Sequence, residues 1–394
     1  MNARFVCIEC GHTHGIREIV YRCGACRGLL EVEADWTWKP TSAKGVWRYR
    51  SLLPVPEEAT PVTLQEGATP LLRCERLAAW AGVRELHVKV EGANPTGSFK
   101  DRGMTVGVTL ARSLGATTLA CASTGNTSAS LAAYGARAGM RPLVLVPTGK
   151  IALGKMAQAL AFGARVVEID GDFDDGMRLV EELSTGGSVY LLNSLNPLRL
   201  EGQKTLMFEV LEATSPDRVL YPVGNGGNVS AGHKALREAH ATGLSRATPM
   251  LSGAQAEGAS PLARAFREKR PYEPHKGADT LATAIRIGAP VNAAKAMRAV
   301  KETGGTFAVV TDDEILAAQK LLAAKEGIFV EPASAAPLAA LKKLVDAGEA
   351  SRSESVVLVA TGNGLKDADI VARFAEPALR VPATLAELRR ILAA

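Results

Sequence analysis

Lys100 stands where a lysine could do chemistry. It follows a loop of turn-forming residues, NPTGSF at 94–99, and opens residues 101–115, a segment typical of a helix despite its glycines. The start of a helix carries partial positive charge and is an unfavourable place for an ammonium ion. The side chain therefore either reaches into solvent or carries an amine that can be neutral and form a Schiff base with a carbonyl group. Position alone leaves both interpretations open.

Two further loops place small polar residues between a strand-like run and a helix. In STGNTSAS, at 123–130, backbone N–H groups could hold an anion, and Asn126 could hydrogen-bond a ring hydroxyl or a carboxylate. The same residues could simply cap the helix. In VATGNGLKD, at 359–367, the hydroxyl of Thr361 could bond a heterocyclic nitrogen, although the loop by itself is only a turn at the end of a strand.

A glycine-rich loop gives a more specific signal. Gly224, Asn225, Gly226, Gly227 and Asn228 follow one another between a strand and a helix. Because glycine has no side chain, the loop backbone can approach an anion, and successive N–H groups can bind a phosphate. An Asn-Gly pair also favours a tight turn. The loop is not a dinucleotide-binding pattern, because a valine occupies the place of the last glycine.

Four of the six cysteines form two Cys-x-x-Cys pairs with twelve residues between them. In a reducing compartment this pattern indicates metal binding rather than disulfides. Four thiolates complete a tetrahedral Zn²⁺ site and leave no open position, so the ion would be structural. His12 and His14 are nearby but are more simply explained as polar loop residues. The predicted ligands are Cys7, Cys10, Cys23 and Cys26.

One segment suggests a different class of enzyme. GKIALGKM, at 149–156, follows an apolar strand and has the outline of the phosphate loop of a nucleotide triphosphatase. Met156, however, occupies the position of the Ser or Thr that would hold magnesium. The residues before it, 151–153, are typical of a helix. A triphosphatase therefore stays only as a remote alternative, as does a non-catalytic zinc-ribbon scaffold that binds protein or nucleic acid.

Composition favours a two- or three-domain α/β enzyme. The chain has 394 residues, of which 47% are apolar, and a formal net charge of +5. Its basic residues form no run, so we expect no nucleic-acid partner, although an anionic small substrate is compatible with this charge. The N-terminus is not typical of a signal peptide, and no apolar run is long enough to span a membrane. We therefore expect a cytoplasmic protein without a membrane partner.

Strand-like and helical segments alternate after residue 60. Near-continuous apolar strands between helices indicate parallel sheets covered on both faces, in which ligands bind at the carboxyl ends of the strands. A capping box, Thr311-x-x-Glu314, marks the start of one helix. Residues 37–61 have the composition of a linker. The predicted strands are 86–91, 143–147, 165–170, 189–193, 218–223, 307–311 and 355–361, and the predicted helices are 152–162, 173–184, 199–213, 229–240, 312–325 and 333–346.

Together these motifs resemble one family. The order LQEGATPLL, NPTGSFKDRG, STGNTS, NSLNPLRLEGQKT, PVGNGGN and ATGNGLKD is similar to that of the threonine synthases, pyridoxal-phosphate enzymes of the tryptophan-synthase-β-like fold. Many of them also begin with a cysteine ribbon. The resemblance implies a cysteine-rich zinc-ribbon-like module at 1–35, a large cofactor-binding α/β domain at 36–92 and 195–394, and a small α/β domain at 93–194. It also implies a homodimer.

The resemblance assigns a role to each motif. Lys100 would bind pyridoxal 5'-phosphate covalently and act as the catalytic residue, with Phe99 helping to define the pocket. Asn126 would contact the ring hydroxyl, the loop at 224–228 the cofactor phosphate, and Thr361 the ring nitrogen. The residues implied for the substrate phosphate are Ser123, Thr127, Ser194 and Arg199.

The implied reaction converts O-phospho-L-homoserine and water into L-threonine and phosphate, by γ-elimination and β-hydration. Three features argue against other members of the fold. Asp101 after the lysine differs from the usual dehydratase pattern, Ser128 stands where cysteine synthases usually have glycine, and NSLNPLRLEG at 193–202 is typical of threonine synthases. A threonine or serine dehydratase, or a synthase that uses phosphoserine, stays as the alternative within the fold.

Overall fold

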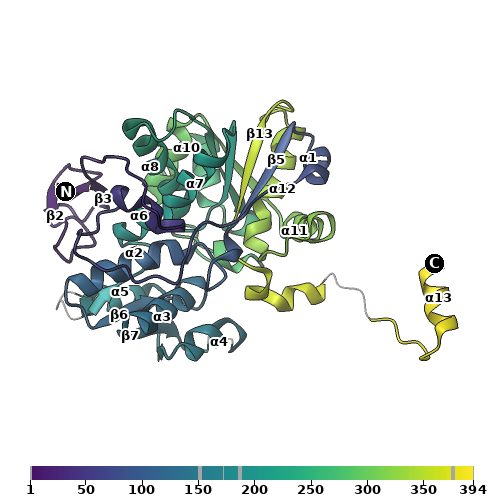
Figure 1. The fold of residues 1–394 in the computed structure, drawn as a ribbon, viewed down its shortest axis with the longest axis horizontal. Coiled ribbons are helices and arrows are strands. Elements are labelled where there is room, and N and C mark those ends of the chain that lie inside the picture. Colours follow the sequence, from purple (N-terminus) through teal and green to yellow (C-terminus); the bar gives the residue numbers. More distant parts are fainter. Residues whose placement is uncertain (1, 150–152, 172, 185–188, 374–377, 394) are drawn as a thin grey trace.

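The computed structural model describes residues 2–149, 153–171, 173–184, 189–373 and 378–393, which form three sheets (Figure 1). The largest has six strands in the order β12-β11-β10-β13-β5-β4. Its strands pair in parallel except β4, which is antiparallel to β5. They are β4 (Leu71–Arg73), β5 (Glu85–Val90), β10 (Arg218–Pro222), β11 (Met250–Ala256), β12 (Phe307–Val310) and β13 (Ser355–Ala360).

Helices cover both faces of this sheet. In β13 the side chains of Val356 and Leu358 pack into a core with one set of helices, and those of Val357 and Val359 into a core with another. This alternation follows from the two-residue period of a strand. The first set is α1 (Glu75–Ala81), α11 (Asp312–Glu326) and α12 (Pro332–Asp346), and the second is α7 (Thr205–Ala213), α8 (Gly227–Thr242), α9 (Pro261–Glu268) and α10 (Ala293–Glu302).

The second sheet is wholly parallel, with four strands in the order β8-β7-β6-β9. These are β6 (Thr118–Ala122), β7 (Arg141–Pro147), β8 (Arg165–Ile169) and β9 (Val189–Leu191). Four helices accompany it, and a fifth, α6, lies beside α2. They are α2 (Lys100–Ser113), α3 (Asn126–Ala138), α4 (Leu153–Ala161), α5 (Phe173–Ser184) and α6 (Pro197–Gln203). The predicted parallel α/β class is confirmed.

The third sheet is antiparallel and lies beside the cysteine pairs, of which only Cys7 belongs to a strand. It consists of β1 (Arg4–Cys7), β2 (Thr13–Gly15) and β3 (Leu30–Glu33) in the order β2-β1-β3. Phe5, Leu30 and Val32 pack into the same core as α2 and α3, and the buried Lys295 of α10 donates a 2.7 Å hydrogen bond to the carbonyl of Leu30. The N-terminal residues are therefore docked firmly on the rest of the chain.

Two sequence predictions need correction. Residues 37–61 are not a linker, because they contain a 3₁₀ segment, η1 (Gly45–Leu52), with buried Trp47. The indole N–H of Trp47 donates a hydrogen bond to Thr105 of α2 at 2.9 Å. Apolar side chains of this segment, among them Trp47, Leu53 and Val55, are buried in the same core as α2 and α3. The predicted helix 199–213 is two helices that meet at Lys204, since α6 packs mainly on α2 and α7 mainly on α8. The remaining strands and helices are shifted by only a few residues, and the capping box of α11 is present.

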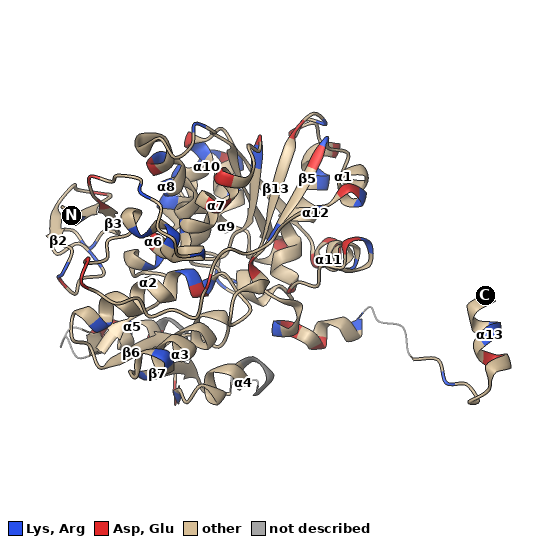
Figure 2. Cartoon of the chain, in the orientation of Figure 1, with Lys and Arg blue, Asp and Glu red and all other residues tan. Residues whose placement is uncertain are grey.

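The C-terminal part leaves the body of the molecule. A short 3₁₀ segment, η5 (Gly364–Arg373), follows β13, and α13 (Leu385–Ala393) lies apart from the sheets (Figure 1). Basic and acidic residues are interspersed throughout the ribbon, as Figure 2 shows. None of the helices in the described ranges has the length and apolar character needed to cross a membrane.

Candidate active site

Lys100 is the first residue of α2, as the sequence predicts. It is half-buried, and its Nζ atom lies 4.3 Å from the centroid of the Phe99 ring. Burial and the nearby guanidinium of Arg199 lower the pKa of the Lys100 amine to about 7, although the carboxyl of Glu331 acts in the opposite direction. An amine with this pKa is partly neutral near pH 7 and can attack a carbonyl carbon.

The two residues that follow Lys100 in α2 are fixed by hydrogen bonds and ion pairs. Asp101 accepts hydrogen bonds from the backbone N–H and hydroxyl of Thr96, at 2.7 and 2.6 Å, and from Ser130 of α3 at 2.6 Å. Arg102 is fully buried between two carboxylates, Glu91 at 2.7 Å and Glu209 at 2.8 Å. Paired buried charges with this many hydrogen bonds hold a backbone rigidly. Lys100 is thus presented from a fixed helical turn.

One glycine on α2 and one on α6 allow these two helices to pack closely. A Cβ atom on Gly103 would lie 2.8 Å from the carbonyl oxygen of Arg199, and one on Gly202 would lie 1.8 Å from that of Arg102. Only glycine at both positions lets α2 and α6 approach backbone to backbone. This close packing brings Arg199, on α6, beside Lys100.

Arg199 is a buried cation without a partner. It is 1% exposed, and none of its three guanidinium nitrogens has a hydrogen-bond acceptor among the described residues. Burial lowers the pKa of Arg199 to about 10. An unpaired buried charge is costly, so this arrangement favours an anionic ligand.

The other residues predicted for the substrate phosphate lie at loop ends. Ser194 immediately precedes the turn into α6, and its carbonyl accepts a 3.0 Å hydrogen bond from Asn292. Ser123 follows β6, and its hydroxyl accepts from the N–H of Gly125 at 3.2 Å. Thr127 is buried in the first turn of α3. The structure places all three where strands or loops run into helices, and their phosphate contacts stay a prediction.

Asn126 and Thr361 both bond one carboxyl group that sequence reasoning missed. The Asn126 amide donates to Glu331 at 2.9 Å, and the Thr361 hydroxyl donates to the same side chain at 3.2 Å. Asn126 begins α3, whereas Thr361 directly follows β13. No local sequence motif marks Glu331. The only signal in the sequence is the glycine at position 362, whose missing side chain leaves room for the Glu331 carboxyl group.

The glycine-rich loop connects β10 to α8, as predicted. Gly226 has a φ of +77°, and a Cβ atom there would lie 2.9 Å from that of Ala296. The side-chain amide nitrogen of Asn228 is buried without a partner among the described residues. Free N–H groups at the start of a helix attract a phosphate. The side chain of Asn225 is bonded within the protein, because its oxygen accepts a hydrogen bond from the N–H of Val291 at 3.3 Å.

These residues fit pyridoxal phosphate. The amine of Lys100, with its lowered pKa, suits the aldehyde of the cofactor. The glycine-rich loop, with the free side-chain amide of Asn228, suits the phosphate. The amide of Asn126 and the hydroxyl of Thr361 suit the polar aromatic ring. The fit rests on the donor set, namely the orphaned Asn228 amide and the loop that a Cβ atom would fill.

The four cysteines of the N-terminal sheet converge. Their sulfur atoms all lie within 4.8 Å of one another, and three pairs are 3.4 to 3.7 Å apart. A tetrahedral ion with metal–sulfur bonds of about 2.3 Å would separate its ligands by about 3.8 Å. The cluster can therefore hold a metal ion.

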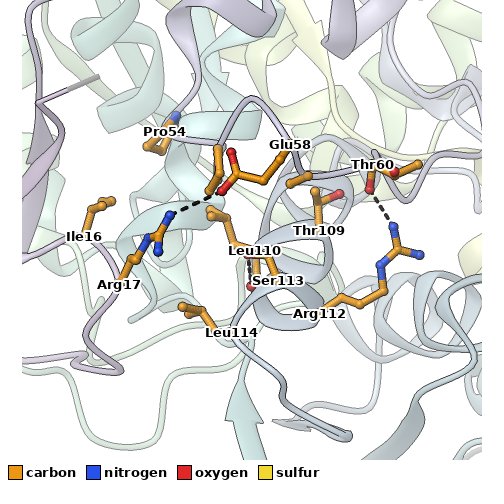
Figure 3. Close-up of a pocket in the computed structure, with 12 residues that line it drawn as sticks. Ile16, Arg17, Pro54, Glu58, Thr60, Thr109, Leu110, Arg112, Ser113 and Leu114 are labelled. Carbon is orange, nitrogen blue, oxygen red and sulfur yellow. Dashed lines mark hydrogen bonds and ion pairs between the residues drawn. The ribbon is translucent and has the colours of Figure 1, made fainter.

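A pocket of about 580 Å³ lies elsewhere, between residues 16–17, residues 54–60 and the C-terminal end of α2 (Figure 3). Its two arginines are already engaged, since Arg17 pairs with Glu58 at 3.3 Å and Arg112 donates to the carbonyl of Thr60. Lys100 begins α2, roughly 15 Å along the helix from residues 109–114. This pocket is therefore not the site of Lys100. The phosphate-loop-like segment at 149–156 includes residues 150–152, which lie outside the described residues.

Comparison with known proteins places the chain in a family. A family model described as "Pyridoxal-phosphate dependent enzyme" matches residues 62–362. Proteins named threonine synthase from Methanocaldococcus jannaschii and Methanosarcina acetivorans are each 52% identical, with 98% of both chains covered. The solved structure of threonine synthase from Escherichia coli has a TM-score of 0.73 at 21% identity and covers 98% of this chain and 94% of its own. Maize serine racemase has a TM-score of 0.66 at 20% identity, covering 77% and 91%.

The chain therefore belongs to the pyridoxal-phosphate dependent enzymes and, within them, to the family of threonine synthases. The two solved structures, at 20–21% identity, show the shared fold. The fold class and the resemblance seen in the sequence are confirmed. The individual site residues and the domain boundaries stay predictions.

Proposed function

We propose that this enzyme converts O-phospho-L-homoserine and water into L-threonine and phosphate, as a carbon–oxygen lyase. The observation that carries the substrate assignment is Arg199, a buried guanidinium beside Lys100 with no partner in the described chain. The glycine-rich loop offers a second, separate anion site. One site suits the cofactor phosphate, and the other suits a phosphate on the substrate.

Pyridoxal phosphate, when bound, supplies an electron sink for the substrate Cα. Lys100 would hold it covalently, the loop at 224–228 would bind its phosphate, and Asn126 and Thr361 would contact its ring hydroxyl and ring nitrogen. Phe99 borders the pocket. The rigid first turn of α2 keeps the amine of Lys100 within reach of successive atoms of the substrate.

Lys100 then moves the protons. The substrate's amino group first takes the place of Lys100, and the freed amine then carries one proton at a time. It takes the proton of Cα, releases it, and then takes a proton from Cβ, while phosphate leaves Cγ with the electron pair of the Cγ–O bond. A proton is delivered to Cγ, which becomes a methyl group. The OH of water is added to Cβ, the remaining proton of water passes to the released phosphate, and a proton returns to Cα to give threonine. Each proton transfer by a placed side chain contributes about 10²–10⁴-fold to the rate.

Arg199 grips the departing phosphate. A guanidinium can donate two parallel hydrogen bonds to phosphate oxygens, which an ammonium ion cannot match. Ser194, Ser123 and Thr127 would add hydroxyl donors. Because Arg199 is desolvated before substrate arrives, its attraction for a phosphate is stronger than that of a surface arginine.

The N-terminal cysteines hold a structural Zn²⁺ in this proposal. Four thiolates at tetrahedral spacing leave no position for substrate, so the ion stabilises the docked N-terminal sheet rather than catalysing. We further propose a cytoplasmic homodimer, in which reduced cysteines stay available for the ion, with a large cofactor-binding domain at 36–92 and 195–394 and a small domain at 93–194.

Product analysis tests the assignment. The purified enzyme with bound cofactor is offered O-phospho-L-homoserine, phosphoserine, threonine and serine separately, and products are identified by mass spectrometry. The proposal expects threonine and phosphate from the first substrate at a far higher rate than any keto acid from the others. Faster conversion of serine or threonine into a keto acid would make the protein a dehydratase.

A further inference from the structure

Glu331 is a buried carboxyl group that joins the two halves of the site. It is 4% exposed and directly precedes α12, but its side chain does not cap that helix. Instead it accepts the hydrogen bond of Asn126 at 2.9 Å with one oxygen and that of Thr361 at 3.2 Å with the other. Asn126 starts α3, which packs on the four-stranded sheet, and Thr361 directly follows β13 of the six-stranded sheet. The carboxyl group of Glu331 therefore links the parts of the chain built around these two sheets.

The surrounding backbone is shaped to admit this carboxyl group. A Cβ atom on Gly362 would lie 2.5 Å from Cδ of Glu331 and 2.6 Å from one of its oxygens. No other residue fits at that position without displacing Glu331. The glycine of the ATGNG motif is therefore explained by the space that Glu331 occupies.

A continuous set of hydrogen bonds leads to Glu331. The N–H of Gly362 donates to the Ser334 hydroxyl at 2.9 Å, and the Ser334 and Thr361 hydroxyls are 2.9 Å apart. If Ser334 donates to Thr361, then the Thr361 hydrogen is directed to the carboxylate. Linked hydrogen bonds of this kind strengthen one another and fix the direction of each hydroxyl.

We propose that Glu331 is a positioning residue for the cofactor, whose carboxylate orients the Asn126 amide and the Thr361 hydroxyl and places a negative charge beside the nitrogen of Lys100. The amide of Asn126 has two hydrogens, and Glu331 occupies one. The other is left to point at the ring hydroxyl that Asn126 is expected to contact. This inference rests on the proposed function only in requiring pyridoxal phosphate at Lys100.

Two cations face this carboxyl group. Lys100 approaches it from the start of α2, and Lys366 from η5. Burial raises the pKa of Glu331, while Asn126, Lys366, Thr361 and Lys100 all act to lower it. The amine of Lys366 is itself half-buried and bonds Gln158 of α4. A carboxylate among these partners would in turn stabilise a proton on the nitrogen of Lys100.

The test compares Glu331→Gln with a matched variant, Glu354→Gln. Glutamine keeps the size but loses the charge, and its amide cannot accept from both donors. We expect Glu331→Gln to retain cofactor, and the pH midpoint of the visible absorbance change of the bound cofactor to fall by about one unit, which corresponds to about 1.4 kcal/mol. Glu354 is also a buried carboxylate, and it pairs with Arg218 at 2.7 Å. It is not among the charged groups that act on Lys100. Glu354→Gln should lower the melting temperature and leave the midpoint unchanged.

An unchanged midpoint in Glu331→Gln would overturn the inference. Should that variant not fold, Glu331→Asp keeps the charge on a side chain one methylene shorter. It is expected to titrate close to the wild type but to bind cofactor more weakly in a fluorescence titration of the apoenzyme. Wild-type affinity in Glu331→Asp would show that Glu331 positions nothing. These readouts use pyridoxal phosphate alone, so they stand even if O-phospho-L-homoserine proves not to be the substrate.

Discussion

The Nζ atom of Lys100 lies over the ring of Phe99, 4.3 Å from its centroid. A lysine in that place would normally gain about 0.5–2 kcal/mol from remaining charged. Burial and the neighbouring Arg199 outweigh this gain and bring the pKa of Lys100 to about 7. Arg199 and Lys100 therefore differ in role, because the guanidinium keeps its charge near pH 7, whereas the amine of Lys100 can lose its proton.

Replacing Lys100 by Ala should lower kcat with O-phospho-L-homoserine by about a thousandfold or more, because every proton transfer loses its carrier. The fold should survive, since the bonds of Asp101 and Arg102 that fix the first turn of α2 are untouched. Borohydride reduction followed by peptide mass spectrometry should find no cofactor on the chain. Lys320→Ala, on an exposed position of α11, is the control and should retain both properties.

Capture of pyridoxal phosphate by the apoenzyme should depend on pH in a way that reports Lys100. With a pKa of about 7, the neutral fraction of the amine rises from about one tenth at pH 6 to about nine tenths at pH 8. The rate constant of capture, followed by stopped-flow absorbance, should therefore rise with pH and level off above about pH 8. A rate that keeps rising to pH 10 would mean that Lys100 has the pKa of an ordinary surface lysine.

Much of this site could be predicted from sequence, because its elements carry local signals. Turn residues before Lys100, glycines between β10 and α8, and the hydroxyl residues before α3 each mark a strand that runs into a helix. The parallel order of the strands then brings such ends together. The two Cys-x-x-Cys pairs likewise predicted a cluster that the structure confirms.

What the sequence did not reveal depends on contacts between distant segments. Glu331 lies 205 residues from Asn126, and nothing around it in the chain marks a site. Trp47 and Tyr49 look like part of a linker until the core that buries them is known. The break at Lys204 also follows from packing, because α6 packs mainly on α2, whereas α7 packs mainly on α8. Helical periodicity continues through the break and cannot show it.

Arg199→Ala should reduce kcat/KM for O-phospho-L-homoserine by about tenfold or more, because a charge-assisted hydrogen bond is worth roughly 1.5–3 kcal/mol. The slow deamination of threonine, which carries no phosphate, should change little, and the absorbance of the bound cofactor should be unaltered. The kcat/KM of Arg199→Lys should lie between those of the wild type and Arg199→Ala, since lysine restores the charge without the bidentate geometry. An equal loss with both substrates would give Arg199 a structural or cofactor-binding role.

Cys7→Ser and Cys23→Ser should each lose the bound metal, measured by atomic emission, and unfold at a lower temperature than the wild type. Phe5, Leu30 and Val32 share a core with α2 and α3, so release of the N-terminal sheet uncovers apolar surface. Cofactor binding should be spared, because the cysteines lie at the N-terminal sheet, whereas Lys100 begins α2. Cys74→Ser, at a buried and isolated cysteine, is the control for metal content. Loss of cofactor absorbance with the metal would place the cysteines within the active site.

The source of the oxygen atoms tests the central claim most directly. The enzyme is incubated with O-phospho-L-homoserine in water enriched in ¹⁸O, and the amino acid and the phosphate are analysed by mass spectrometry. The proposed mechanism breaks the Cγ–O bond and adds water at Cβ, so threonine should carry one ¹⁸O in its hydroxyl group and phosphate should carry none. Unlabelled homoserine together with ¹⁸O-labelled phosphate would show that water attacks phosphorus, and would contradict the assignment.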